Sequence, residues 1–228
     1  MSVLLLRLAG PMQSWGDSSR FQTRGTRREP TKSGVLGLLA AAQGRRRTDS
    51  LEDLLNLRFG VRVDQPGTII RDFHTAHDHA GNSMPLSNRY YLADAAFVAG
   101  VEGDQGLLAA LDQAIQTPRF PLYLGRRACP AEGQISLGVR PGPLCEELSA
   151  ERWWASPWHR KRCAHDVALD LYLDAEPGQH GDEIRDVPLS LDPANRQYGW
   201  RTVYHHTIRK PNPDGTAEPD WLAALGGA

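Results

Sequence analysis

The sequence predicts an α+β fold made of one larger and one smaller unit. Residues 3–8 form an apolar run broken only by Arg7, which is typical of a buried strand. Residues 35–42 are apolar almost all round, as expected of a helix packed on a sheet. After about residue 145, apolar and polar residues alternate in 167–173, which indicates half-buried strands. These three observations favour a mixed N-terminal domain followed by a smaller β-rich domain.

The first helix is expected to begin after Pro30, with Thr31 as its N-cap, and to stop at Gly44. Gly34 and Gly37 would let this helix approach a sheet closely, at some cost in helix propensity. Arg45-Arg46-Arg47 follows its end, where the helix dipole favours cations. A short second helix is expected to begin at residue 49 or 50, with a capping box.

Strands are expected at residues 59–63, 68–75 and 89–101, and the polar segment 76–88 is predicted to be a projecting flexible loop. Asp104 should cap another helix that ends before Pro118. Residues 121–124 and 135–137 return to extended structure. The order strand, helix, strand, strand, helix, strand matches the ferredoxin-like split βαβ arrangement.

The predicted domain boundaries follow from this pattern. Residues 1–144 form the larger domain, and residues 145–210 form the small β-rich one, with further strands near 184–189 and 201–208. The tail, residues 211–228, is expected to be partly loose.

Charge is distributed unevenly along the chain of 228 residues, whose net charge is -1. Residues 1–49 contain nine basic and three acidic residues, a local charge of +6. This indicates a local anionic partner. Of the 26 basic residues 23 are arginine, whose planar fork suits phosphate, although a GC-rich genome would also explain the ratio.

Three unpaired cysteines and no apolar run long enough to span a membrane predict a reduced, cytoplasmic setting without membrane attachment. The first residues also lack the pattern of a signal peptide.

The segment 10–47 holds the strongest candidates for binding RNA. It places polar, aromatic and basic residues around a loop that leads into a helix N-terminus, where backbone N–H groups attract phosphate. Trp15 would stack on a base. In the alternative interpretation, Trp15 fills the core and the arginines form a solvated face. The candidates are Gln13, Ser14, Trp15, Arg20, Arg24, Arg27, Lys32 and Ser33.

Common enzyme motifs are missing. The lysine of Thr31-Lys32-Ser33 lacks the glycines of a phosphate-binding loop, so nucleotide hydrolysis is not expected. No G-x-S-x-G motif is present. His74, His77 and His79 lack a fourth metal ligand at a familiar spacing, but they could cleave RNA without metal or contact it without catalysis. No metal, cofactor or small-molecule substrate is expected.

Two further basic segments remain open. Arg126 and Arg127 lie in a glycine-containing turn that suits a phosphate backbone, although a solvated turn is the simpler alternative. Trp153, Trp154 and Trp158 precede Arg160-Lys161-Arg162, and they form either a partner interface or a linker pinned to the core.

Four motifs resemble one known family. Residues 6–16 (LRLAGPMQSWG), 30–39 (PTKSGVLGLL), 71–75 (RDFHT) and 123–130 (YLGRRACP) are similar, in the same order, to motifs of the CasD subunits of Cascade, the type I-E CRISPR complex. The resemblance covers most of residues 1–140.

This resemblance implies a RAMP-type protein with a ferredoxin-like (RRM-like) domain and a projecting thumb at about residues 76–88. Such subunits grip the 5′ handle of the CRISPR RNA (crRNA) in an antiviral ribonucleoprotein, and they contact its backbone subunit and large subunit. Arg71 and His74 lie in a shared motif, and Met84 or Leu86 in the thumb could wedge beside a base. A different subunit cuts the precursor RNA in type I-E. Related type I-C proteins cut RNA themselves, so a metal-independent endoribonuclease is the alternative.

Overall fold

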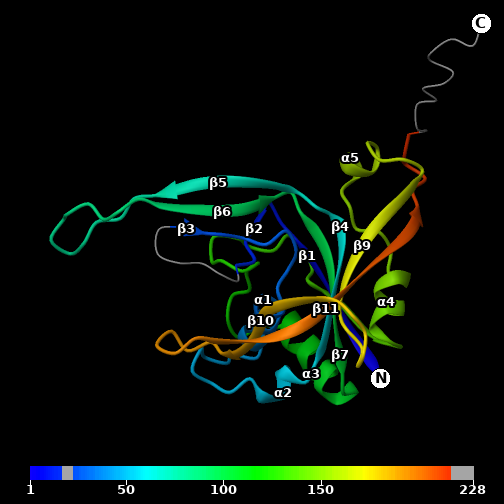
Figure 1. Ribbon diagram of the computed structural model, residues 1–228, viewed down its shortest axis with the longest axis horizontal. Helices are drawn as coiled ribbons and strands as arrows, with labels where there is room; N and C mark the ends of the chain where they lie inside the picture. The colour runs from blue at the N-terminus through cyan, green and yellow to red at the C-terminus, as the bar shows by residue number, and fades with distance from the viewer. Residues whose placement is uncertain (17–22, 217–228) are drawn as a thin grey trace, which may run out of the picture.

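The computed structural model describes residues 1–16 and 23–216 (Figure 1). Its main element is a seven-stranded sheet in the order β10-β11-β9-β4-β7-β1-β8, in which all neighbouring strands are antiparallel. The strands are β1 (Ser2–Ala9), β4 (Arg58–Gln65), β7 (Ala96–Gly103), β8 (Ser136–Pro141), β9 (Asp166–Asp174), β10 (Asp182–Ser190) and β11 (Gln197–Pro211). The α+β class predicted from the sequence is confirmed.

Helices cover both faces of this sheet. On one face, α1 (Lys32–Ala42) and α3 (Gln105–Gln116) bury the larger core, which includes Leu4, Leu6 and Leu8 of β1. On the other face, α4 (Leu144–Ala150) packs on Val3 and Leu5. Because side chains alternate along a strand, one continuous apolar run can supply both cores.

Side-chain caps fix the starts of the two longer helices. The Thr31 side chain accepts from the Gly34 N–H, and the Asp104 side chain accepts from the Leu107 N–H. Both caps were predicted. The short α2 (Glu52–Leu55) begins later than expected, and its N-cap, Leu51, makes no side-chain hydrogen bond, so the predicted capping box is wrong.

A second, smaller sheet contains a long hairpin. It consists of β2 (Met12–Gln13), β3 (Thr23–Arg24), β5 (Thr68–His74) and β6 (Ser87–Ala93). β5 and β6 pair from Thr68↔Ala93 to His74↔Ser87, and in Figure 1 this hairpin projects far beyond the main sheet. The projection is therefore a paired hairpin whose tip is residues 75–86.

The single strand expected at residues 89–101 is wrong. The chain leaves β6 for β7 at Asp94, which adopts a φ of 55°, and the two strands belong to different sheets. Because the apolar pattern continues on both sides of Asp94, the sequence pattern does not reveal this break.

The C-terminal strands continue the main sheet. β9 pairs with β4 through Gly60↔Leu173, Val61↔Tyr172 and Arg62↔Leu171, and β11 and β10 follow outward. The strands expected near 167–173, 184–189 and 201–208 are confirmed, whereas α4 and α5 (Pro157–Arg160) were not predicted. Residues 212–216 are held by hydrogen bonds, including Thr216 N–H to the Cys163 carbonyl at 3.0 Å.

Candidate nucleic-acid interface

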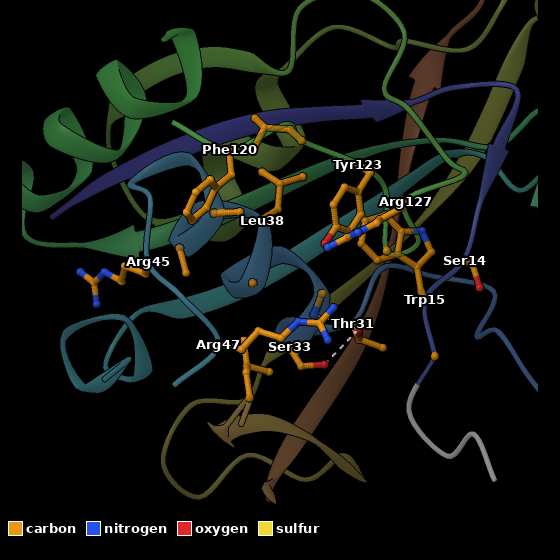
Figure 2. A pocket seen from close by; sticks show the side chains of 18 of the residues that line it. Ser14, Trp15, Thr31, Ser33, Leu38, Arg45, Arg47, Phe120, Tyr123 and Arg127 are labelled. Carbon is orange, nitrogen blue, oxygen red and sulfur yellow. Dashed lines mark hydrogen bonds between the residues drawn. The ribbon is translucent and has the colours of Figure 1, made fainter. Parts of the chain in front are cut away.

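A groove of about 910 Å³ lies over α1 and collects residues from four distant parts of the chain. Its floor is the small-residue face of α1, including Gly34, Gly37 and Ala41. Its walls come from residues 120–130 and from the turn between β10 and β11. Figure 2 shows Phe120 and Leu38 in one part of the groove, and Tyr123, Arg127 and Trp15 in another.

Among the described residues, five arginines and no acidic side chain line this groove. Arg46, Arg47, Arg127 and Arg196 are exposed, and no carboxylate of residues 1–16 or 23–216 lies within 4.0 Å of their guanidinium groups. Unneutralised arginines above a floor of small residues suit an anionic ligand.

Arg45 differs from the other four because its charge is already engaged. Its guanidinium makes two hydrogen bonds to the Asp53 carboxylate, both at 2.5 Å, and one to the Ser50 carbonyl at 2.9 Å. The hydrogen bond from Arg45 is the main cause that lowers the pKa of Asp53. Arg45 therefore shapes the groove wall more than it supplies free charge.

Apart from the buried Trp15, three aromatic rings of the described residues lie among these arginines. Phe120 is 42% exposed, and Tyr123 and Tyr198 are half-buried. Any of the nucleobases can stack on such rings, so this contact does not depend on the RNA sequence. The groove thus has groups for both parts of a single-stranded nucleotide.

Gln13 and Trp15 do not have the role that the sequence predicted. Trp15 is 1% exposed, and its ring packs so tightly on α1 that a Cβ atom on Gly34 would lie 2.7 Å from Trp15 Cε3. The buried Gln13 amide donates to the Leu8 and Ala95 carbonyls and accepts from Trp15 Nε1 at 3.0 Å. No ring face is left for a base, which corrects the prediction of stacking on Trp15 and of polar contact with Gln13.

The predicted role of Lys32 in binding RNA is also wrong, because its ammonium group points inward. Lys32 Nζ lies 2.8 Å from Asp174 Oδ2, and the residue is 6% exposed. The Lys32 N–H at the start of α1 donates to Asp186 Oδ2 at 2.8 Å. A protein carboxylate therefore occupies the helix N-terminus where the sequence analysis expected phosphate. Ser33 still lines the groove, with its hydroxyl donating to Thr31 Oγ1 at 3.3 Å (Figure 2).

Arg126 and Arg127 have different positions despite being neighbours. Arg126 donates to the carbonyls of Tyr90, Arg24 and Gly25 and lies 4.8 Å from the Tyr91 ring centroid. It fastens the hairpin base to the β3 segment, which corrects its predicted role as a phosphate ligand. Arg127 is exposed and lines the groove.

The remaining candidates lie away from the groove floor. Ser14 donates to the Tyr90 carbonyl at 3.2 Å and lines the groove. Arg24 is exposed on β3, and Arg27 forms an ion pair with Glu29 at 2.7 Å. Arg20 lies outside the described residues.

The β5–β6 hairpin carries Arg71, His74 and Met84. Arg71 is exposed, Met84 is 51% exposed, and His74 Nε2 lies 2.7 Å from Asp72 Oδ2. Large apolar side chains are also exposed along the hairpin, and Phe73 at 64% is the most exposed of them. The hairpin is thus a second surface, with both apolar and basic character.

Several groove residues were not predicted from the sequence. Arg45, Arg46 and Arg47 were noted only for the helix dipole, and Phe120, Tyr123, Arg196 and Tyr198 were not selected. The arginine triplet was visible in the sequence, but only folding brings the β10–β11 turn to α1.

Comparison with known proteins identifies the family. A family model described as CRISPR-associated protein (Cas_Cas5) matches residues 3–204. The chain belongs to the Cas5 family of CRISPR-associated proteins.

Individual relatives of this Cas5 chain agree with that assignment. It is 39% identical over 159 residues to the CRISPR system Cascade subunit CasD of Escherichia coli (strain K12), covering 60% of this chain and 71% of the relative. The resemblance to CasD seen in the motifs is thereby confirmed.

Two solved structures are similar over nearly the whole Cas5 chain. A chain of a CRISPR RNA-guided surveillance complex superposes with a TM-score of 0.76 at 33% identity, covering 98% of this chain and 97% of the other. A structure described as that of a Cas protein gives 0.71 at 38% identity, covering 95% and 99%. In the described part of this chain, no helix is long and apolar enough to cross a membrane.

Proposed function

We propose that this chain is a non-catalytic, RNA-binding subunit of a type I-E CRISPR surveillance complex that acts in antiviral defence, and that it grips and caps the 5′ handle of the crRNA. The observation that carries the proposal is the groove over α1, which in the described part of the chain has four exposed arginines and no lining carboxylate. The likeness to CasD and to a chain of an RNA-guided surveillance complex supports RNA as the anion.

The groove offers both chemistries that single-stranded RNA needs. Arg46, Arg47, Arg127 and Arg196 neutralise backbone phosphates, and Tyr123 and Tyr198 stack on unpaired bases. Ser14 and Ser33 add hydroxyl groups at the groove wall. In this account the buried Gln13, Trp15 and Lys32 build the groove without touching RNA.

The β5–β6 hairpin acts as the thumb in this proposal. Its exposed Phe73, Met84 and Leu86 contact neighbouring protein subunits, the backbone subunit and the large subunit, or wedge beside a base. We further infer that β4-β7-β1-β8 with α1 and α3 is a ferredoxin-like RAMP unit, since these elements follow the split βαβ order along the chain.

Mixing the purified chain with end-labelled CRISPR repeat RNA and with its isolated 5′ handle tests this function. Both RNAs should bind and remain intact, and the Arg46→Ala/Arg47→Ala variant should bind the handle at least tenfold more weakly. Handle affinity equal to that of an unrelated RNA of the same length would contradict the proposal.

One observation keeps an endoribonuclease as the second candidate. The Asp72 carboxylate lies 2.7 Å from His74 Nε2, which places a carboxylate beside a residue type that can transfer protons. Cleavage of repeat RNA in the presence of EDTA, abolished by His74→Ala, would establish that activity and overturn the non-catalytic assignment.

A further inference from the structure

Residues 153–162, here called the α5 surface, combine tryptophans with basic side chains and do not line the groove. Sequence alone left it either as a partner interface or as a linker pinned to the core. The structure divides these roles among its tryptophans. Trp153 Nε1 donates to the Asp64 carbonyl at 2.8 Å, and Trp154 Nε1 donates to Glu151 Oε1 at 2.9 Å. Trp158, in contrast, is 50% exposed.

Hydrogen bonds to the buried side chains of Asn212 and Gln65 hold the α5 surface in place. Asn212, 1% exposed, donates through Nδ2 to the carbonyls of Arg160 and Ala164, both at 2.8 Å. At the N-cap of α5, the Ser156 N–H donates to Gln65 Oε1 at 3.0 Å. The fold thus fixes a short segment that presents an indole ring to solvent, which lowers the entropy cost of binding there.

The cations of the α5 surface are only partly neutralised. Arg160 Nε pairs with Asp214 Oδ2 at 3.1 Å. Lys161 and Arg162 are exposed, and no carboxylate elsewhere in the described chain lies within 4.0 Å of their charged groups. Burial, together with the charge of Arg162, lowers the pKa of His159, whose ring meets Trp158 edge-on at 5.6 Å.

The α5 surface lacks the cluster of apolar side chains that forms the core of a protein interface. Trp158 is the only large hydrophobic side chain of residues 153–162 that is more than about a third exposed. One flat ring followed by two cations instead matches a stacked base and its adjacent phosphates.

We propose that the α5 surface is a second binding site for single-stranded nucleic acid, in which Trp158 stacks on a base and Lys161 and Arg162 bind the flanking phosphates. It is separate from the groove: in Figure 1, α5 lies well away from both α1 and the tip of the β5–β6 hairpin. The site therefore takes a strand segment that the groove does not hold, and it goes beyond the proposed function.

The test measures the anisotropy of fluorescein-labelled dT20 and rU20 titrated with the full chain in the Arg46→Ala/Arg47→Ala background, which suppresses binding in the groove. Trp158→Ala should weaken binding by about 5- to 150-fold, as expected for loss of one stacked base. Trp158→Phe should keep most of the affinity. Lys161→Glu/Arg162→Glu should reduce the log–log salt slope by at least about 1.4, which corresponds to two phosphates.

Trp200→Ala is the matched control, because Trp200 is 64% exposed on β11 and should leave binding unchanged. A loss seen with dT20 only, or with rU20 only, supports the site and identifies the strand as DNA or RNA. Affinity of Trp158→Ala within twofold of its parent, or an equal loss in Trp200→Ala, overturns the site. Loss of a co-purifying protein subunit with unchanged oligonucleotide affinity also overturns it, in favour of a protein contact. The groove and the α5 surface share no residue. Failure of the handle-binding test would therefore leave the result at the α5 surface unaffected.

Discussion

The Lys32 N–H donates to Asp186 Oδ2 at 2.8 Å, which joins the first turn of α1 to a strand 154 residues farther along the chain. Arg201 binds the same Asp186 carboxylate and also Asp174, which in turn pairs with Lys32 Nζ. These four side chains neutralise one another in a largely buried site. Because β10 and β11 carry the turn that forms one groove wall, this contact sets the position of that wall.

Removing Asp186 should destabilise the whole fold. Asp186→Ala leaves Arg201, whose side chain is 10% exposed, with one carboxylate fewer and uncovers the N-terminus of α1. Breaking a buried pair in this way costs about 3–5 kcal/mol in the free energy of unfolding, to be measured by urea denaturation. Asp182→Ala, at the exposed start of the same strand, should change it by less than about 0.5 kcal/mol. Equal effects from the two variants would show that the network contributes little.

Two glycines of α1 should respond oppositely to the same substitution. A Cβ atom on Gly34 would lie 2.7 Å from the buried Trp15 ring, whereas on Gly37 its nearest neighbour is Leu191 Cδ1 at 3.7 Å. Gly34→Ala should therefore lower the midpoint of thermal unfolding by several degrees. Gly37→Ala should raise it slightly, since alanine is favoured over glycine in a helix by up to about 1 kcal/mol. A stabilising Gly34→Ala would mean that Trp15 is not packed on α1 as described.

Sequence patterns predicted what depends on neighbouring residues. Thr31 and Asp104 were identified as caps because the capping hydrogen bond spans only three residues. The alternation in β9 was equally visible, since one face of that strand is buried. Arg45, Arg46 and Arg47, at the end of the arginine-rich segment, line the groove.

Side-chain roles that depend on distant contacts were not predictable in the same way. Trp15 looked like a stacking ring because it stands in a basic loop, but α1 covers it. Arg126 and Arg127 are indistinguishable in sequence, yet carbonyls more than 100 residues away engage only Arg126. Arg196 and Tyr198 reach the groove only because β10 and β11 extend the main sheet.

Arg126 and Arg127 should separate stability from binding. Arg126→Ala removes three hydrogen bonds to backbone carbonyls, so hydrogen exchange at the β6 amides should accelerate and stability should fall by about 2–3 kcal/mol. Arg127→Ala should leave stability and hydrogen exchange unchanged. It should lower the affinity for handle RNA severalfold, as measured by fluorescence anisotropy. If Arg127→Ala proved the more destabilising variant, the assignment of the two roles would be wrong.

The Arg45–Asp53 pair should give a small, acid-sensitive contribution to stability. The folded state lowers the pKa of Asp53, so the contribution is present above the unfolded pKa of about 3.9 and is lost as pH falls through the lower folded value. The pair is partly exposed, so the amount is below about 1 kcal/mol. Urea midpoints of wild type and Asp53→Asn should differ at pH 7 and converge towards pH 2. A difference that stays constant with pH would exclude this pair as its source.

The central claim is that the groove over α1 binds an RNA backbone through arginines that no carboxylate of residues 1–16 or 23–216 neutralises. It is tested most directly by the salt dependence of handle RNA affinity in wild type and in Arg46→Ala/Arg47→Ala. Each phosphate neutralised on a single strand contributes about 0.7 to the log–log slope, so this variant should lose about 1.4. The control is Arg209→Ala, which removes an exposed cation on β11 that is paired with Asp166 of β9. This variant should keep the wild-type slope. A slope and affinity unchanged by the loss of Arg46 and Arg47 would contradict the account.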